Sequence, residues 1–159
     1  MAKAWLLAGL DCPLLFHAMV FGAAVHKDFV CSSQHHPRAQ DALAHKLIVI
    51  QNLKEAIEHK RNIVSDETIL AISFLMVHEP GILRIPEEEK RTPFHPPLHR
   101  VQWLDFYGVM RPIPEHREAV MKIVSLRGGF HKIELYGLSE TFAAYVSLYC
   151  SSFWCKFSM

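Results

Sequence analysis

The sequence has no strong charge of either sign and few of the residues that punctuate or cross-link a chain. Its 159 residues include 17 basic and 16 acidic side chains, so the net charge is +1, and there are only 7 glycines and 4 cysteines. A balanced charge gives no electrostatic reason to expect direct contact with nucleic acid. Because hydrophobic residues make up 50% of the chain, disorder throughout is not expected either.

The cysteines lack the spacing of a zinc site, since they contain no CxxC pair. They are expected to be free thiols in a reducing compartment, and they stand at Cys12, Cys31, Cys150 and Cys155. The eleven histidines are scattered along the chain. We therefore expect neither a metal nor a cofactor. The alternative is a metal-binding module that uses the cysteines together with His35, His36, His95 and His99.

The sequence also lacks an apolar run long enough to cross a membrane. The stretch from Trp5 to Val25 is apolar overall, but Asp11 and Pro13 interrupt it. A spanning helix needs roughly 20 apolar residues. The apolar run Ala4–Leu10 is too short for a secretory signal peptide. We therefore expect a protein that neither enters a membrane nor is secreted.

Motifs of the common enzyme classes are missing as well. The chain has no HExxH, GxSxG, P-loop or GxGxxG pattern. Asp105-Phe106 is followed by Tyr107 before Gly108, so it does not form a kinase Asp-Phe-Gly motif. We expect that the protein is not an enzyme. A small helical enzyme with an acid–base site assembled in space is the alternative.

The sequence does contain apolar residues that recur at helical spacing in successive blocks. They predict helices over 14–30, 37–61, 68–79, 98–110, 115–127 and 138–157. A short apolar turn at Leu6–Leu10 precedes them, and Asp11 is the expected cap of the next helix, with Pro13 in its first turn. The prediction is a single all-α domain over 1–159, with six or seven mostly antiparallel helices and an irregular, proline-rich insertion loop at 81–97.

The same spacing assigns buried faces to three of these helices. The 68–79 helix is apolar on nearly all sides and is the expected centre of the fold. Gly22, Ala23 and Ala24 would allow another helix to approach the 14–30 helix closely. That helix is expected to bury Leu14, Leu15, Ala18, Phe21, Val25 and Phe29. The 37–61 helix is expected to bury Leu43, Leu47, Ile50, either Leu53 or Lys54, and Ile57.

Two short motifs mark helix ends. Ser65 is a predicted N-cap, and the two acidic residues after it suit the positive end of a helix dipole. Arg127-Gly128-Gly129 is predicted to close the 115–127 helix, because glycine adopts left-handed backbone conformations without a side-chain clash. Either glycine could hold that conformation. The tripeptide occurs once, between apolar helices, which favours helix closure over an RNA-binding role.

Four segments, in this order, resemble the regulatory region of fungal binuclear zinc-cluster transcription factors, the fungal-specific transcription factor domain. They read LLFHAMVFGAAVHKD, then AHKLIVIQNLKEAI with SDETILAISFL, then HREAVMKIVSLRGGFHKI, then LYGLSETFAAYVSL. In such proteins an Arg-Gly-Gly tripeptide ends one helix and a Leu-x-Gly-Leu-like turn begins the next, which here contains Gly137. The helix start at Ser65 is also typical of them. The resemblance covers roughly 13–148.

The resemblance implies a regulatory or interaction module located in the nucleus, or otherwise in the cytoplasm. Its expected partners are proteins, or a second copy of the chain, bound through apolar helix faces. Whether it also binds a small-molecule effector is left open. The family's six-cysteine zinc cluster is absent from the sequence, so DNA binding is carried over to no residue here. The family's helical region is longer, and we expect a truncated chain that self-associates through Phe153, Trp154 and Phe157.

Overall fold

A computed structural model of the chain describes residues 2–31, 39–58, 63–78 and 113–135. These residues form five α-helices and one short 3-10 helix, and none of them forms a strand. The elements are α1 (Ala2–Asp11), α2 (Pro13–Cys31), α3 (Ala39–Glu58), α4 (Asp66–Val77), α6 (Pro114–Arg127) and η4 (Phe130–Lys132). The predicted all-α class is confirmed. The helices predicted over 98–110 and 138–157 and the loop at 81–97 lie outside the described residues, so five α-helices are seen rather than six or seven.

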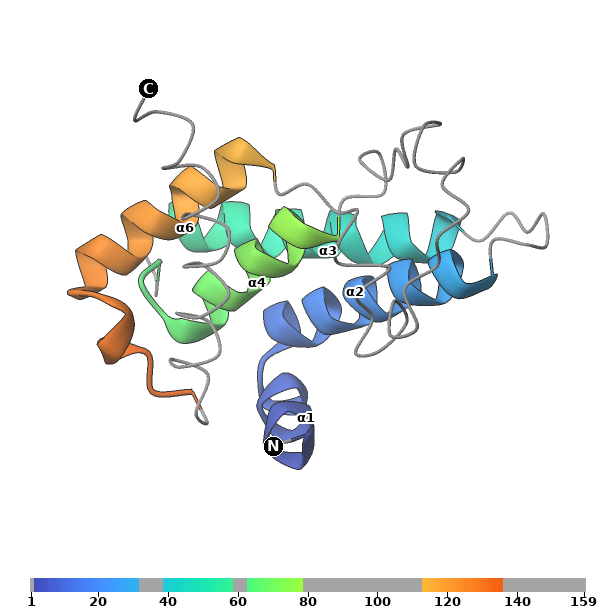
Figure 1. The fold of residues 1–159 in the computed structure, drawn as a ribbon, viewed down its shortest axis with the longest axis horizontal. Coiled ribbons are helices and arrows are strands. Elements are labelled where there is room, and N and C mark those ends of the chain that lie inside the picture. The colour runs from blue at the N-terminus through green and yellow to red at the C-terminus, as the bar shows by residue number, and fades with distance from the viewer. Residues whose placement is uncertain (1, 32–38, 59–62, 79–112, 136–159) are drawn as a thin grey trace, which may run out of the picture.

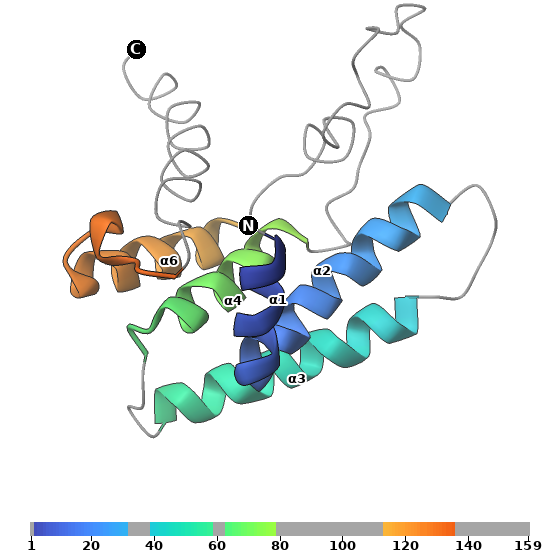
Figure 2. The same cartoon turned by 90° about the horizontal axis from the view of Figure 1, so that it is seen from below.

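Helix α4 lies at the centre of the described helices (Figure 1). It contacts α2, α3 and α6, while α2 and α3 pack side by side along much of their length. Helix α1 packs against α2, and α3 runs along the edge of the group (Figure 2). No helix in the described ranges is long and apolar enough to cross a membrane.

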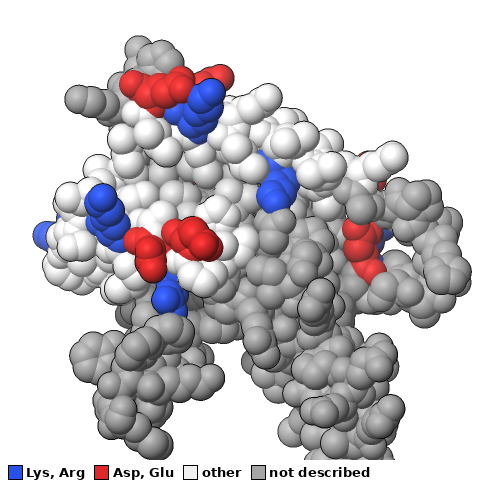
Figure 3. All heavy atoms as spheres, turned by 90° about the horizontal axis from the view of Figure 1, so that it is seen from above, with Lys and Arg blue, Asp and Glu red and all other residues white. Residues whose placement is uncertain are grey.

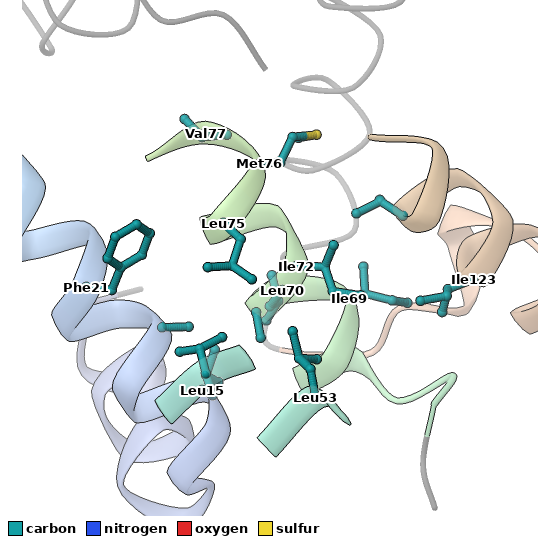
Figure 4. Packing of buried hydrophobic residues seen from close by; sticks show 14 of the residues in the cluster. Leu15, Phe21, Leu53, Ile69, Leu70, Ile72, Leu75, Met76, Val77 and Ile123 are labelled. Atoms are coloured by element: carbon teal, nitrogen blue, oxygen red, sulfur yellow. The ribbon is translucent and has the colours of Figure 1, made fainter. Parts of the chain in front are cut away.

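The central position of α4 follows from its sequence, as predicted. Ten of its twelve residues, including Ile69, Leu70 and Leu75, are buried. Figure 4 shows these side chains between α2, which contributes Leu15 and Phe21, and the helices α3 and α6. Exposing any side of a helix that is apolar all round would cost free energy, so the other helices surround α4.

Helices α4 and α6 are joined at both ends and run in opposite directions. At one end the Ile113 N–H, at the start of α6, donates to the carbonyl of Met76 near the end of α4 over 3.2 Å. At the other end Arg127 of α6 contacts Asp66 of α4. Between these points Val120, Ile123 and Val124 are buried, but Met121 beside them is 38% exposed.

Helix α2 buries four members of its predicted stripe, which are Leu15, Ala18, Phe21 and Val25. Leu14 is half-buried, and the burial of the Phe29 side chain lies outside what the structure describes. The expected close approach of another helix occurs at Gly22. A Cβ atom placed there would lie 2.8 Å from Cδ1 of Phe74, on α4, which is closer than a real contact permits. A larger residue at position 22 would therefore force the Phe74 ring or one of the helices to move. The neighbouring Ala23 is exposed.

The predicted cap at Asp11 is wrong. Asp11 is the last residue of α1, because the alanines and leucines before it favour a full helix rather than a single turn. Helix α2 begins at Pro13, and the carbonyl of Cys12 accepts the Phe16 N–H over 2.9 Å. The prediction of proline in the first turn is confirmed, and Cys12 is a free thiol.

The predicted buried stripe of α3 is also largely wrong. Leu53 is buried, but four other members are exposed by 43–58%, namely Leu43, Leu47, Ile50 and Ile57. Helix α3 instead packs through Ala42, Val49 and Leu53. At about 100° of rotation per residue, this face lies about a quarter turn from the predicted one. The helix has an apolar surface wider than the contact it makes, and its spacing alone does not show which part is covered.

Candidate functional site

The two sequence motifs that mark helix ends lie together in the structure. Ser65 caps α4 as predicted, with an extended backbone (φ −74°, ψ 158°) and with Oγ accepting the Thr68 N–H over 3.2 Å. The next residue, Asp66, faces the end of α6, where Arg127 precedes the two glycines. The antiparallel packing of α4 and α6 therefore joins residues that are far apart in the chain.

The Asp66 carboxylate is buried, with a residue exposure of 7%, and its two oxygens have different partners. Oδ2 accepts the backbone N–H groups of Glu134 and Leu135 over 2.9 and 3.0 Å. Oδ1 lies 2.7 Å from Nη2 of Arg127. The Oδ1 contact is an ion pair without hydrogen-bond geometry, so Oδ1 is a buried oxygen that accepts no hydrogen bond. Two backbone hydrogen bonds and one ion pair therefore offset only part of the cost of removing this charge from water.

The Arg127 guanidinium links three segments. Besides its contact with Asp66, its Nε donates to the carbonyl of Lys132 over 2.9 Å. Its Nη1 donates to the carbonyl of Val64, just before the cap of α4. A planar guanidinium with several fixed donors can make such divergent contacts, which the single ammonium group of a lysine cannot reproduce. We call the residues Val64, Ser65, Asp66, Arg127 and Lys132 the α4–α6 clamp.

The glycines turn the chain so that the clamp can form. Gly128 ends α6 with a left-handed backbone (φ 99°, ψ 14°), and Gly129 also has a positive φ (φ 112°, ψ 169°). The Gly129 N–H donates to the carbonyl of Val124 over 2.9 Å, which closes the last turn of the helix. The chain then forms η4 and returns, which brings the Lys132 carbonyl to the Arg127 side chain. Both glycines, rather than one, hold a conformation that L-residues rarely adopt.

We expect Gly129→Ala to destabilise the protein more than Gly128→Ala. The backbone of Gly128 lies in the left-handed region, which costs an alanine about 1 kcal/mol. The backbone of Gly129 lies in a region occupied almost only by glycine, and a Cβ there would lie 3.0 Å from Nδ1 of His131, so the expected cost is about 2–3 kcal/mol. Urea denaturation followed by circular dichroism measures both costs.

Asparagine provides the control for this comparison, because it tolerates the left-handed region better than other residues with side chains. Gly128→Asn should therefore be close to the unsubstituted protein in stability, whereas Gly129→Asn should not. Equal stability of both alanine variants and the unsubstituted protein would contradict the assigned backbone conformations.

The clamp explains several of the predicted site residues and adds three that sequence reasoning did not assign, namely Val64, Asp66 and Lys132. Ser65, Arg127, Gly128 and Gly129 meet as described, while Gly137 lies outside the described residues. Asp66 was interpreted only as a charge that suits a helix dipole, and its contact with Arg127 was not foreseen. The signal available in the sequence was an acid in the first turn of one helix and an arginine in the last turn of another.

The clamp is suited to holding helices together rather than to chemistry. A general acid or base needs an oxygen that a substrate can reach, but Asp66 is buried, with Oδ2 accepting two backbone N–H groups and Oδ1 held against Arg127. Within the described ranges, no three side chains of histidine, cysteine, aspartate or glutamate are grouped as metal ligands. His35, His36, His95 and His99 lie outside those ranges.

Histidines form a second set of contacts between the helices. The Nδ1 atoms of His17 on α2 and His45 on α3 lie 2.8 Å apart. Burial, and next the charge of His45, lower the pKa of His17. At the end of α4, the ring of His78 stacks on Phe74 with centroids 5.4 Å apart and lies 5.6 Å from the ring of His26. These rings fill the space between α2 and the last turn of α4.

The buried His78 is expected to make the free energy of unfolding sensitive to acid. Burial lowers its pKa to about 4; the hydrogen bond to the Phe74 carbonyl raises it in part, and the charge of His26 lowers it further. The unfolded chain, with a histidine pKa near 6.5, therefore binds more protons than the folded chain between these values. Above pH ~6.5 His78 is neutral in both states and the folded state keeps its full stability. As the pH falls from there towards 4, we expect the free energy of unfolding to decrease by about 3 kcal/mol.

Urea denaturation at several pH values between 7 and 4 measures this slope, and His78→Gln should remove most of it. The matched control is His131→Gln, because His131 is an exposed histidine on η4. A slope that is the same in the unsubstituted protein and in both variants would show that His78 titrates as it does in the unfolded chain.

No family model, no curated protein and no solved structure matches this chain.

Proposed function

We propose that the chain is a regulatory or interaction module of a transcription-factor-like protein, similar to the middle region of fungal zinc-cluster regulators of RNA polymerase II transcription. The observation that carries the proposal is the α4–α6 clamp. The helix start at Ser65 and the Arg-Gly-Gly helix end are two of the features on which the resemblance depends, and they occupy one contact network. A pair of residues with a shared structural role is a stronger basis for a resemblance than two separate motifs.

The arrangement is suited to presenting helix faces to other proteins. Helix α4 is enclosed by α2, α3 and α6, and the clamp holds α6 against it. The outer helices then expose large apolar side chains, among them Leu6 on α1, Leu47 on α3 and Leu126 on α6. The proposed partners are therefore proteins, or a second copy of the chain, that bind through apolar helix faces.

Direct contact with DNA is not part of the proposal. On the face shown in Figure 3, the acidic and basic side chains of the described part are few and interspersed among uncharged ones. A DNA-binding surface usually collects positive charge on one face. The chain would act through proteins that are themselves bound to DNA, and its proposed location is the nucleus.

A reporter assay tests the proposal. The chain is fused to an unrelated DNA-binding domain in yeast, and transcription of a reporter is compared with that from the DNA-binding domain alone. We expect the fusion to change reporter expression, Asp66→Ala to abolish the change by breaking the clamp, and Glu67→Ala to preserve it. Fusions of equal abundance in the nucleus that leave the reporter unchanged would refute the regulatory role.

A further inference from the structure

Helix α3 carries an apolar stripe beside the face that packs on α2 and α4. Leu43, Leu47, Ile50 and Ile57 are 54, 52, 43 and 58% exposed, and Lys54 stands between the last two. We call these five residues the α3 stripe. Because α3 runs along the edge of the described helices (Figure 2), the stripe lies on an outer side of that group.

The spacing of the stripe indicates what kind of surface would cover it. Its members are separated alternately by four and three residues, an average of 3.5, which is the repeat of a coiled-coil seam. Side chains at this spacing form a narrow row that another helix of the same repeat can follow. A strand or a flat surface has no matching row.

We propose that a second copy of this chain covers the α3 stripe, with the two α3 helices antiparallel. The stripe is self-complementary, as the interface of a two-fold symmetric dimer must be. A two-fold axis near Ile50 would place the apolar side chains of each copy against those of the other. The contact is then a two-helix coiled coil built on the outside of two folded domains.

The position of Lys54 selects the antiparallel orientation. In a parallel pair in register, Lys54 would face Lys54 of the second copy, and the like charges would repel each other. In the antiparallel pair it faces a leucine of the second copy instead, with its aliphatic stem against the leucine and its ammonium at the rim. Glu58, 3.7 Å from the Lys54 ammonium, can keep its ion pair there. Antiparallel helix dipoles also attract each other.

The size of the stripe predicts a weak dimer. Fourteen residue steps from Leu43 to Ile57 span about 21 Å at ~1.5 Å per residue. One helix pair of this length buries less than the roughly 800 Å² per partner of a standard interface. We therefore expect monomer and dimer to exchange as the protein concentration changes, with a dissociation constant on the order of micromolar or above.

Analytical ultracentrifugation of the full chain over a wide concentration range tests the proposal. The double variant Leu47→Gln/Ile50→Gln should raise the dissociation constant at least about tenfold, because it places polar groups at the centre of the contact. The matched control is Leu7→Gln/Leu10→Gln, which changes two side chains on α1 that are 48 and 64% exposed. It should leave the dissociation constant unchanged.

Two further measurements keep the proposal testable if the double variant folds poorly. Lys54→Leu completes the apolar stripe and should lower the dissociation constant. A mixture of Lys54→Glu and unsubstituted chains should associate no more tightly than the unsubstituted chain alone, since Lys54 does not face Lys54 in the antiparallel pair. Tighter association in the mixture would overturn the orientation.

An unsubstituted chain that stays monomeric at all concentrations would overturn the proposal. Association that persists in Leu47→Gln/Ile50→Gln would also overturn it. The inference relies on the proposed function only for its biological role. Ultracentrifugation measures association and the reporter assay measures regulation, so the failure of one is distinguishable from the failure of the other.

Discussion

Replacing Asp66 with alanine is expected to lower the free energy of unfolding by about 3–5 kcal/mol. The substitution leaves two backbone N–H groups, that of Glu134 and the buried one of Leu135, without their acceptor. It also removes the carboxylate opposite the Arg127 guanidinium. Each of these groups would then lose the partner that compensates its separation from water. Urea denaturation monitored by circular dichroism measures the loss.

Glu67→Ala is the control for Asp66→Ala, because Glu67 is the next residue and also an acid in the first turn of α4. Its loss removes a favourable interaction with the helix dipole, worth about 0.5 kcal/mol. If the two variants lost the same stability, the dipole would account for Asp66 and the clamp would contribute nothing. Asp66→Asn should fall between them, since it keeps an acceptor oxygen but removes the charge.

Replacing Phe21 with alanine is expected to cost about 3–5 kcal/mol. The Phe21 side chain is fully buried on α2, facing α4 (Figure 4), and its ring lies edge-on to that of His78 with centroids 6.4 Å apart. Alanine would leave a cavity at the contact of the two helices. The surrounding helices cannot collapse into this space, because Gly22 already lies against Phe74. Thermal or urea denaturation at neutral pH measures the effect.

Phe16→Ala is a closely matched control, because it changes the same residue type on the same helix. Phe16 is 40% exposed, and its ring contacts that of His17 edge-on with centroids 5.3 Å apart. We expect a loss of about 1 kcal/mol or less. A similar loss of stability in both variants would mean that α2 faces the core with a different side.

The helix ends were predicted well from the sequence. Ser65 starts α4 and Gly128 ends α6, as local patterns indicated. These features depend on hydrogen bonds and backbone angles within a few residues, so nearby sequence contains the information needed. The central position of α4 was predicted for a similar reason, since a helix that is apolar on all sides has only one favourable location.

The face of α3 was not predictable in the same way. Ala42, Val49 and Leu53 form one apolar row, and Leu43, Leu47 and Ile50 form another beside it. Helical spacing identifies both rows equally well. The first row is buried because it fits against α2 and α4, and that fit depends on the shapes of three helices together. The second row is left available to a further partner.

The sequence by itself determined the helical class, the helix ends at Ser65 and Gly128, and the central position of α4, because each follows from interactions among neighbouring residues or from overall hydrophobicity. Only the tertiary structure decided which row of α3 is buried and that Asp66 meets Arg127. The reason is that both depend on how helices distant in the chain pack against each other. Helical spacing says which residues share a face, but contact between two faces is a property of the folded molecule.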